Sequence, residues 1–321
     1  MTEKTAFAGI DIGATNIKFG LVDGTGEVLF KQRRPTMVEK GVEPLMHLVT
    51  NIGESLLYNA AEEGYDVRHL GIGTPGAVDV SSGKVTGNCP NIPGWEGMEI
   101  GRILRERLNL PIYVDNDANT MALAEARFGA AAGHKSVVCV TLGTGVGGGV
   151  IIDGKIWRGS NGAAGELGHL SIDFEGPECQ CGSSGCIEAY CSSRAMIERT
   201  RQQLAGGLTP VFKDVLEDDL ENLTIRKLFV AARKGDEVAQ ATIADTARYL
   251  GIGLAGIVNL FNPESVVIGG GIADGGFSFI EAVKAEIKKR AFGAAVVNLR
   301  VTSATLGNDA GFIGASILGE N

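Results

Sequence analysis

The chain has 321 residues, of which 44% are hydrophobic and 21% are charged, and its formal net charge is -9. This composition is that of a globular protein with a substantial core, and it excludes a disordered chain. The length exceeds the usual size of a single core, which predicts two domains with a cleft for a small ligand. The acidic balance argues against nucleic acid and anionic lipid as partners.

The apolar runs fall short of the roughly 18 residues that a membrane span needs. The first residues lack the apolar region of a signal peptide, so a cytoplasmic protein without membrane contact is expected.

Apolar periodicity in the first part of the chain predicts an α/β unit that opens with a β-meander. The expected strands cover residues 6–12, 17–22, 28–30, 69–73 and 112–114, and the expected helices cover 42–63, 99–108 and 118–130.

A second strand, glycine loop and strand follow at 136–142, 143–149 and 150–152, and they repeat the opening of the chain. This repeat predicts a duplicated α/β architecture in which two glycine loops face one another across a cleft. Beyond residue 192 the period is helical, with the polar stretch Lys213–Asn222 as a surface connection. The expected later elements are a strand over 265–268, a helix over 277–291, a strand over 298–303 and a helix over 311–318.

The loop Asp11-Ile-Gly-Ala-Thr-Asn16, with Lys18 beyond it, offers backbone N–H groups, a hydroxyl, an amide, a cation and a carboxylate. These are the groups that surround phosphates and Mg²⁺ in proteins. The alternative is a hairpin loop with chance polar residues. The second loop, Gly143-Thr-Gly145 and the glycines after it, favours phosphate binding.

Asp115-Asn116-Asp117-Ala-Asn119 lies where a buried strand is expected to end and a helix to begin. Ligand groups gather at this edge of open α/β sheets. The alternative is that Asn116 or Asp117 only caps the helix, which residues of these types often do.

Three cysteines stand close together at 179, 181 and 186, ten or more residues after His169. A Cys₃His set suits tetrahedral Zn²⁺, and with four protein ligands the zinc would be structural. The alternative is three free surface thiols. Glu166 and Glu188 flank this set, and paired carboxylates suit the hydroxyls of a sugar, although both could be ordinary surface residues.

These motifs resemble the ROK family (repressor, open reading frame, kinase), and especially its bacterial glucokinase-like members. The resemblance covers nearly the whole chain. It rests on the loops above together with Gly73-Thr-Pro-Gly76, Asn91-Ile-Pro-Gly-Trp95, Gly165-Glu-Leu-Gly-His169, Cys179-x-Cys181-x4-Cys186-x-Glu188 and Gly269-Gly270-Gly271.

The resemblance implies an actin-like, hexokinase-type (ribonuclease H-like) duplicated α/β fold with two domains around a cleft. A small N-terminal domain would cover residues 1–118 and be completed by a C-terminal helix at about 307–321. A larger domain, 119–306, would carry the zinc-binding loop. A homodimer or a dimer of dimers is also implied.

The resemblance further implies a role for each matching residue in an ATP-dependent kinase that forms glucose 6-phosphate with Mg²⁺. Asp117 matches the general base. The sugar-binding positions are Gly76, Asn116, Glu166, His169 and Glu188. The nucleotide-binding positions are Asp11, Gly13, Thr15, Asn16, Lys18, Thr144, Gly145, Gly270 and Gly271. The zinc ligands are His169, Cys179, Cys181 and Cys186, with the second ring nitrogen of His169 left for the sugar.

Rival interpretations stay open within this family. Repressors carry a winged-helix extension before the first glycine loop, and ten residues cannot hold one. Some N-acetylhexosamine kinases have an arginine at the position of Ala77. The alanine in this chain therefore favours a glucokinase. Mannose, fructose, allose or N-acetylmannosamine as acceptor, polyphosphate as donor, and a silent sugar sensor are the alternatives.

Overall fold

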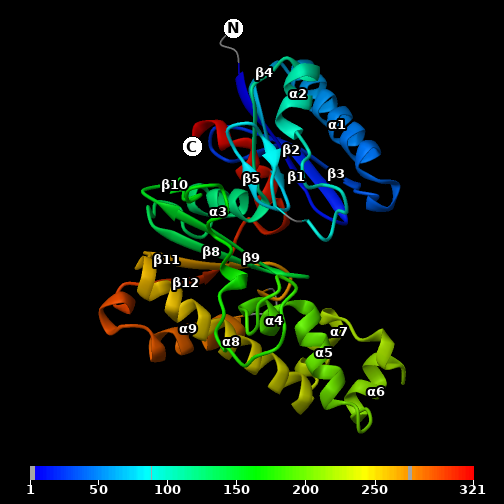
Figure 1. Ribbon diagram of the computed structural model, residues 1–321, viewed down its shortest axis with the longest axis vertical. Coiled ribbons are helices and arrows are strands. Elements are labelled where there is room, and N and C mark those ends of the chain that lie inside the picture. The colour runs from blue at the N-terminus through cyan, green and yellow to red at the C-terminus, as the bar shows by residue number, and fades with distance from the viewer. Residues whose placement is uncertain (1–3, 88, 274–276) are drawn as a thin grey trace. The chain divides into compact units, whose positions relative to one another are not determined.

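The computed structural model describes residues 4–87, 89–273 and 277–321. Internal contacts divide the chain into two compact units. Unit 1 consists of Met1–Cys139, Gly149–Gly165 and Thr305–Asn321, and unit 2 consists of Val140–Gly148 and Glu166–Ala304. Figure 1 shows the elements of both units by label and by colour along the chain.

The first sheet has five strands in the order β3-β2-β1-β4-β7. Its strands are β1 (Lys4–Ile12), β2 (Asn16–Val22), β3 (Val28–Pro35), β4 (Tyr65–Thr74) and β7 (Ile112–Asn116). The first three strands form an antiparallel meander, and β4 and β7 add parallel to β1. Because parallel strands end at the same edge, the glycine loop after β1 and the polar residues after β7 belong to one edge.

Unit 1 packs helices against this sheet. They are α1 (Val42–Glu62), α2 (Ile100–Leu108), α3 (Asp117–Arg127) and α10 (Ala310–Ser316). The buried face of α1 carries Leu45, Val49, Ile52 and Leu56 at helical spacing, and α1 and α2 lie side by side in Figure 1. A two-stranded ribbon, β5 (Val78–Asp79) with β6 (Lys84–Val85), follows β4.

The C-terminal helix α10 lies in direct backbone contact with β4 and α3. A Cβ atom on Gly71 would come within 1.7 Å of the Ala315 carbonyl oxygen, and one on Gly314 within 1.7 Å of the Thr120 carbonyl oxygen. Only glycine allows such an approach. This contact explains why residues 305–321 pack with the N-terminal part of the chain.

The second sheet has the order β10-β9-β8-β11-β12, which repeats the topology of the first. Its strands are β8 (Val137–Leu142), β9 (Val146–Ile152), β10 (Lys155–Ile156), β11 (Ser265–Gly269) and β12 (Arg300–Ser303). In both sheets a meander is followed by parallel strands. The expected duplication is therefore confirmed.

The helices of unit 2 are α4 (Ile187–Cys191), α5 (Ser193–Gln203), α6 (Pro210–Leu216), α7 (Ile225–Arg233), α8 (Glu237–Phe261) and α9 (Phe277–Arg290). Side-chain caps begin most of them, including Thr209 for α6, Thr224 for α7 and Asp236 for α8. Single 3₁₀ turns occur at Val38–Lys40, Leu167–His169, Leu220–Asn222, Gly293–Val296, Gly307–Asp309 and Leu318–Glu320.

One expectation differs from the structure. The stretch Lys213–Asn222 is wrong as a plain surface connection, because its first residues finish α6 and bury Leu216, and its last three form a 3₁₀ turn. By packing, unit 1 continues past residue 118 to Cys139, since α3 lies against α10. The proposed boundary at 118 follows the sequence motifs rather than these contacts.

Candidate functional site

The first glycine loop joins β1 to β2 and is closed by its own backbone. The Gly13 N–H donates to the Asn16 carbonyl over 3.1 Å, and the Thr36 hydroxyl donates to the Gly13 carbonyl over 2.6 Å. Asp11 and Lys18 are register partners across the two strands. Asp11, Gly13, Thr15, Asn16 and Lys18 are therefore held together as the sequence predicts.

The Asp11 carboxyl is strongly perturbed. Its pKa is raised to about 7, mainly by burial and also by the charge of Asp117, while Lys18 lowers it. Gly311 of α10 lies against this side chain, because a Cβ there would come within 2.5 Å of the carboxyl. Two carboxylates from the ends of β1 and β7 thus influence one another, which is typical of sites that bind a cation or move a proton.

Asn116 and Asp117 have different positions at the start of α3. Asn116 is the N-cap, and its Oδ1 accepts from the N–H groups of Ala118 over 2.9 Å and Asn119 over 3.3 Å. Asp117 is the first helical residue and is half-buried. Asp117 Oδ1 also accepts from the Ala118 N–H over 2.9 Å, but the N-cap position and the bond from the Asn119 N–H belong to Asn116.

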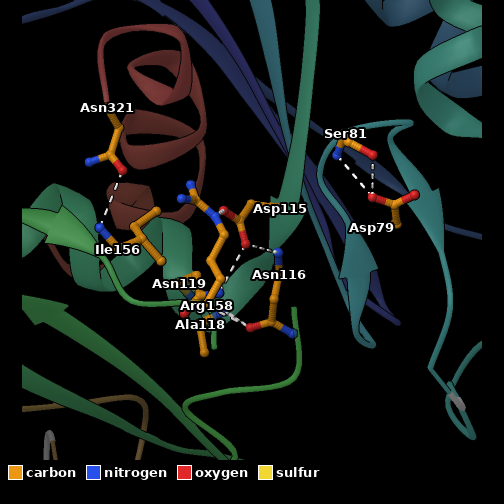
Figure 2. A network of polar contacts seen from close by, with 9 residues as sticks. All are labelled: Asp79, Ser81, Asp115, Asn116, Ala118, Asn119, Ile156, Arg158 and Asn321. Atoms are coloured by element: carbon orange, nitrogen blue, oxygen red, sulfur yellow. Dashed lines mark hydrogen bonds and ion pairs between the residues drawn. The ribbon is translucent and has the colours of Figure 1, made fainter. Parts of the chain in front are cut away.

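Asp115 is unavailable as a substitute base. Only 2% of it is exposed, and it forms an ion pair of 2.7 Å with Arg158. Figure 2 shows that its other oxygen accepts from the Asn116 backbone and the Asn119 amide. Three donors therefore already bind the two oxygens of this carboxylate.

Gly76 forms a turn that contacts Asn116. Its φ of 89° suits glycine, and a Cβ would come within 2.4 Å of the Cys89 sulfur. Its carbonyl accepts from the Asn116 amide over 3.1 Å. The buried Trp95 donates to the Thr74 hydroxyl over 2.7 Å, which links two motifs that lie 21 residues apart.

The metal candidates form one cluster in unit 2. One ligand atom from each of His169, Cys179, Cys181 and Cys186 lies within 4.8 Å of the other three. Cys179 Sγ is 3.6 Å from His169 Nδ1, and Cys181 Sγ is 3.6 Å from Cys186 Sγ. Tetrahedral zinc bonds of about 2.0–2.3 Å put neighbouring ligand atoms roughly 3.5–3.8 Å apart, so the cluster fits zinc.

Glu188 connects the cluster to the second glycine loop. It lies in the first turn of α4, and its Oε2 accepts from the Val146 N–H over 2.9 Å. A Cβ on Gly145 would come within 2.5 Å of that oxygen. Gly145 therefore makes room for the Glu188 carboxylate, a role that its place in a glycine loop did not indicate.

Glu166 precedes the 3₁₀ turn Leu167–His169, and His169 is its last residue. A Cβ on Gly168 would come within 2.0 Å of the Val146 carbonyl, so this turn packs directly on β9. Burial raises the pKa of Glu166, His169 lowers it and Glu188 raises it, in decreasing order of effect. Glu166, His169 and Glu188 are thus brought together in unit 2.

A pocket of about 440 Å³ adjoins the second glycine loop within unit 2. Gly270, with a φ of 88°, packs on Leu142 at the end of β8. The lining combines apolar and cationic side chains and includes Thr144 and Gly271 from the sequence prediction. It also includes Leu142, Gly143, Ser193, Ile225, Arg226, Phe229, Arg233 and Ile272.

The sequence prediction missed most of these lining residues. Several of them belong to α7, which begins some eighty residues after the glycine loop and carries no motif of its own. The predicted site residues fall into two groups. Asp11, Gly13, Thr15, Asn16, Lys18, Gly76, Asn116 and Asp117 belong to unit 1, and the remainder belong to unit 2.

A family model, related sequences and a related structure each match nearly the whole of this chain. The ROK family model matches residues 7–321. A glucokinase of Thermotoga maritima is 34% identical over 98% of this chain and 96% of its own length. A xylose repressor of Caldicellulosiruptor bescii is 33% identical over 95% of this chain and 76% of its own length.

A solved ROK family glucokinase from Streptomyces griseus, in complex with glucose and AMPPNP, superposes with a TM-score of 0.82. It is 35% identical, and the match covers 98% of this chain and 98% of that chain. Among the described helices, none is long and apolar enough to cross a bilayer. The repeated sheets are those of the actin-like, hexokinase-type fold, and the chain belongs to the ROK family.

Proposed function

We propose that this protein transfers the γ-phosphoryl group of ATP to the 6-hydroxyl of glucose, with Asp117 as the general base. The observation that carries the proposal is the different surroundings of two adjacent residues, Asn116 and Asp117, at the start of α3. Asn116 supplies the helix cap, and the neighbouring Asp117 is half-buried beside the carboxyl of Asp11. The named kinase relatives support a sugar as the acceptor.

The acceptor side of the proposal consists of hydrogen-bonding groups suited to a polyol. Glu166, Glu188 and the free ring nitrogen of His169 would accept or share hydroxyl protons. Asn116 and Gly76 would contribute from unit 1. Zinc, when bound by the Cys₃His cluster, would fix the His169 ring and the loop that carries Glu188, without taking part in a chemical step.

The donor side uses the glycine loops and the unit 2 pocket. Apolar side chains such as Phe229 and Ile225 suit a purine, and Arg226 and Arg233 suit phosphates. Mg²⁺, when bound with ATP, supplies charge neutralisation at the phosphates. Asp11 offers the carboxylate for this cation, and Lys18 adds a positive charge beside it.

In the proposed reaction, Asp117 holds the sugar hydroxyl by accepting its hydrogen bond. It takes the proton as the oxygen attacks the γ-phosphorus, and the bond from that phosphorus to the bridging oxygen breaks to release ADP. Phosphoryl transfer has a loose transition state, so positioning and charge neutralisation contribute more than proton removal. Exclusion of water by the bound substrates would suppress hydrolysis of ATP.

A regulator that binds sugar without turnover is the second candidate, favoured by the similarity to a xylose repressor. In such a protein a general base and two phosphate-binding loops would have no function. Another acceptor hexose is an alternative within the kinases, because one side chain can discriminate between two hydroxyl orientations.

A kinase assay on the purified protein tests the proposal. The acceptors are glucose, mannose, fructose, allose, N-acetylmannosamine and xylose, each with Mg-ATP or polyphosphate. We expect the highest kcat/KM for glucose with Mg-ATP. Sugar binding by calorimetry without turnover for any acceptor would favour the regulator, and the same preparations in a sedimentation experiment would test the expected homodimer.

A further inference from the structure

A buried carboxylate two residues before the candidate base forms an ion pair. Asp115 is 2% exposed, and its Oδ2 is 2.7 Å from Nε of Arg158, whose side chain is 26% exposed. Its Oδ1 accepts from the Asn116 backbone N–H over 2.8 Å and from the Asn119 amide over 2.9 Å. A buried carboxylate needs such a partner, because removal of the cation leaves an uncompensated charge.

The partners of Asp115 fix the start of α3. Asn116 caps the helix through its Oδ1 and donates from its amide to Gly76. Figure 2 shows Asp115, Asn116 and Asn119 converging with Arg158 at the first turn of this helix. Asp117 is the next residue after the cap, so its direction depends on this network.

Arg158 also closes the loop that precedes Glu166. Its carbonyl accepts from the Ala164 N–H over 3.2 Å. Gly162 in the same loop, with a φ of 85°, packs on the Val78 carbonyl, where a Cβ would come within 2.3 Å. Glu166 follows this closed loop two residues after Ala164. The side chain of Arg158 therefore contacts the support of Asp117, and its backbone carbonyl closes the segment that leads into the candidate sugar motif.

We propose that Arg158 is a positioning residue whose side chain fixes Asp117 through Asp115. The inference rests on the proposed kinase function for its kinetic consequence. It predicts a specific pattern: loss of the Arg158 side chain lowers kcat, and KM for ATP changes little. A purely structural ion pair would lower the stability of the fold and leave the kinetics of the folded molecules unchanged.

The test compares Arg158→Met with the matched variant Arg105→Met. Arg105 also ties β7 within unit 1, by donating to the carbonyls of Ile112 and Ser82, but at the other end of the strand. We expect Arg158→Met to lose about 100-fold in kcat, the effect of a displacement of about 1 Å at a reacting group. Arg105→Met should keep its kcat within about twofold at comparable loss of stability.

A double variant separates positioning from simple charge loss. Asp115→Asn combined with Arg158→Met removes the unpaired buried charge, so it should recover about tenfold in kcat over Arg158→Met alone. Arg158→Lys should fall between the wild type and Arg158→Met, because it keeps the charge without the guanidinium geometry. Additive losses in the double variant would contradict an action through Asp115.

Amide hydrogen exchange provides a readout that needs no activity. The amides of Ala118 and Asn119, held by the Asn116 cap, should exchange faster in Arg158→Met and not in Arg105→Met. Unchanged local exchange overturns the positioning role, whatever the activity. If the wild type phosphorylates no sugar, the proposed function fails, and this exchange pattern alone decides the role of Arg158.

Discussion

Asn116 and Asp117 are adjacent and have similar side chains, but these side chains have different surroundings at the edge of the first sheet. The sequence left open whether Asn116 or Asp117 caps the following helix, since both residue types do so well. Asn116 accepts both helix N–H bonds, and its amide reaches Gly76. The Asp117 carboxylate also accepts from the Ala118 N–H over 2.9 Å, but the N-cap position itself is filled by Asn116. The assignment of Asp117 as the base is therefore supported by its half-buried place beside the carboxyl of Asp11.

The raised pKa of Asp11 makes a prediction about stability. The native carboxyl titrates at about 7, mainly because it is buried, and the unfolded one near its ordinary 3.8. Between these values the native state binds more protons, so stability falls as pH rises. Asp11→Asn should lack this fall. Urea unfolding from pH 4.5 to 8, without Mg²⁺ or nucleotide, checks it, and parallel curves for the two proteins would contradict it.

Sequence reasoning found residues that stand in local motifs and missed those that act through distant contacts. The Cys₃His set is compact in the chain, so its clustering could be predicted, although bound zinc stays a prediction. Arg158 meets Asp115 across 43 residues, and Glu125 meets Thr305 across 180. Neither pairing leaves a pattern in a single sequence, because both depend on how the strands assemble.

Among the helices, α3 supports more than the candidate base at its start. Glu125 near its end is fully buried and accepts from the N–H groups of Ala130 over 2.8 Å, Thr305 over 3.0 Å and Leu306 over 2.8 Å. The chain passes from unit 2 into unit 1 at Thr305. A buried carboxylate thus anchors the return of the C-terminal segment to unit 1.

Replacement of Glu125 by Gln should lower the free energy of unfolding by about 3 kcal/mol, because an amide donor then faces buried N–H donors. Urea denaturation measures the change. Glu106→Gln is the matched control, since that carboxylate is 64% exposed in its pair with Arg102 and should matter by about 0.5 kcal/mol or less. Equal stability of the Glu125 variant and the wild type would contradict the anchoring role.

The loop from His169 to Cys186 should bind about one zinc ion per chain. We expect Cys181→Ser to lose the metal and most of the sugar affinity, since metal binding stabilises the fold of such loops. Elemental analysis and sugar titration measure both. Cys191→Ala, a buried thiol just beyond the cluster, should keep both properties. If the metal-free protein keeps its full sugar affinity, zinc does not support the site.

At the level of elements, strong periodicity allowed most of the fold to be predicted. The strands before the two glycine loops follow from apolar pattern alone, and the helical period beyond residue 192 agrees with the helices α5 to α8. The error at Lys213–Asn222 arose because charged residues obscure the apolar periodicity of the short helix α6. In this helix Phe212 and Leu216 are fully buried. The close approach of α10 to β4 could not be predicted, since many other glycines occur in turns.

At the scale of the whole molecule, the acidic charge of -9 and the repeated five-stranded sheets fit a family of small-molecule binding proteins better than a polyanion-binding one. Duplication explains why two similar glycine loops occur in one chain. Each unit contributes its own set of candidate groups: carboxylates with a base in unit 1, and a metal cluster with a pocket in unit 2.

The most direct measurement is the rate of ADP formation by Asp117→Asn and by the wild type, with saturating glucose and Mg-ATP. Asn keeps the shape of the side chain but cannot take a proton, so kcat should fall by about 10²–10⁴-fold with glucose and ATP affinities nearly unchanged. Near-normal turnover in a well-folded Asp117→Asn protein would contradict the assignment of Asp117 as the base of a hexose kinase.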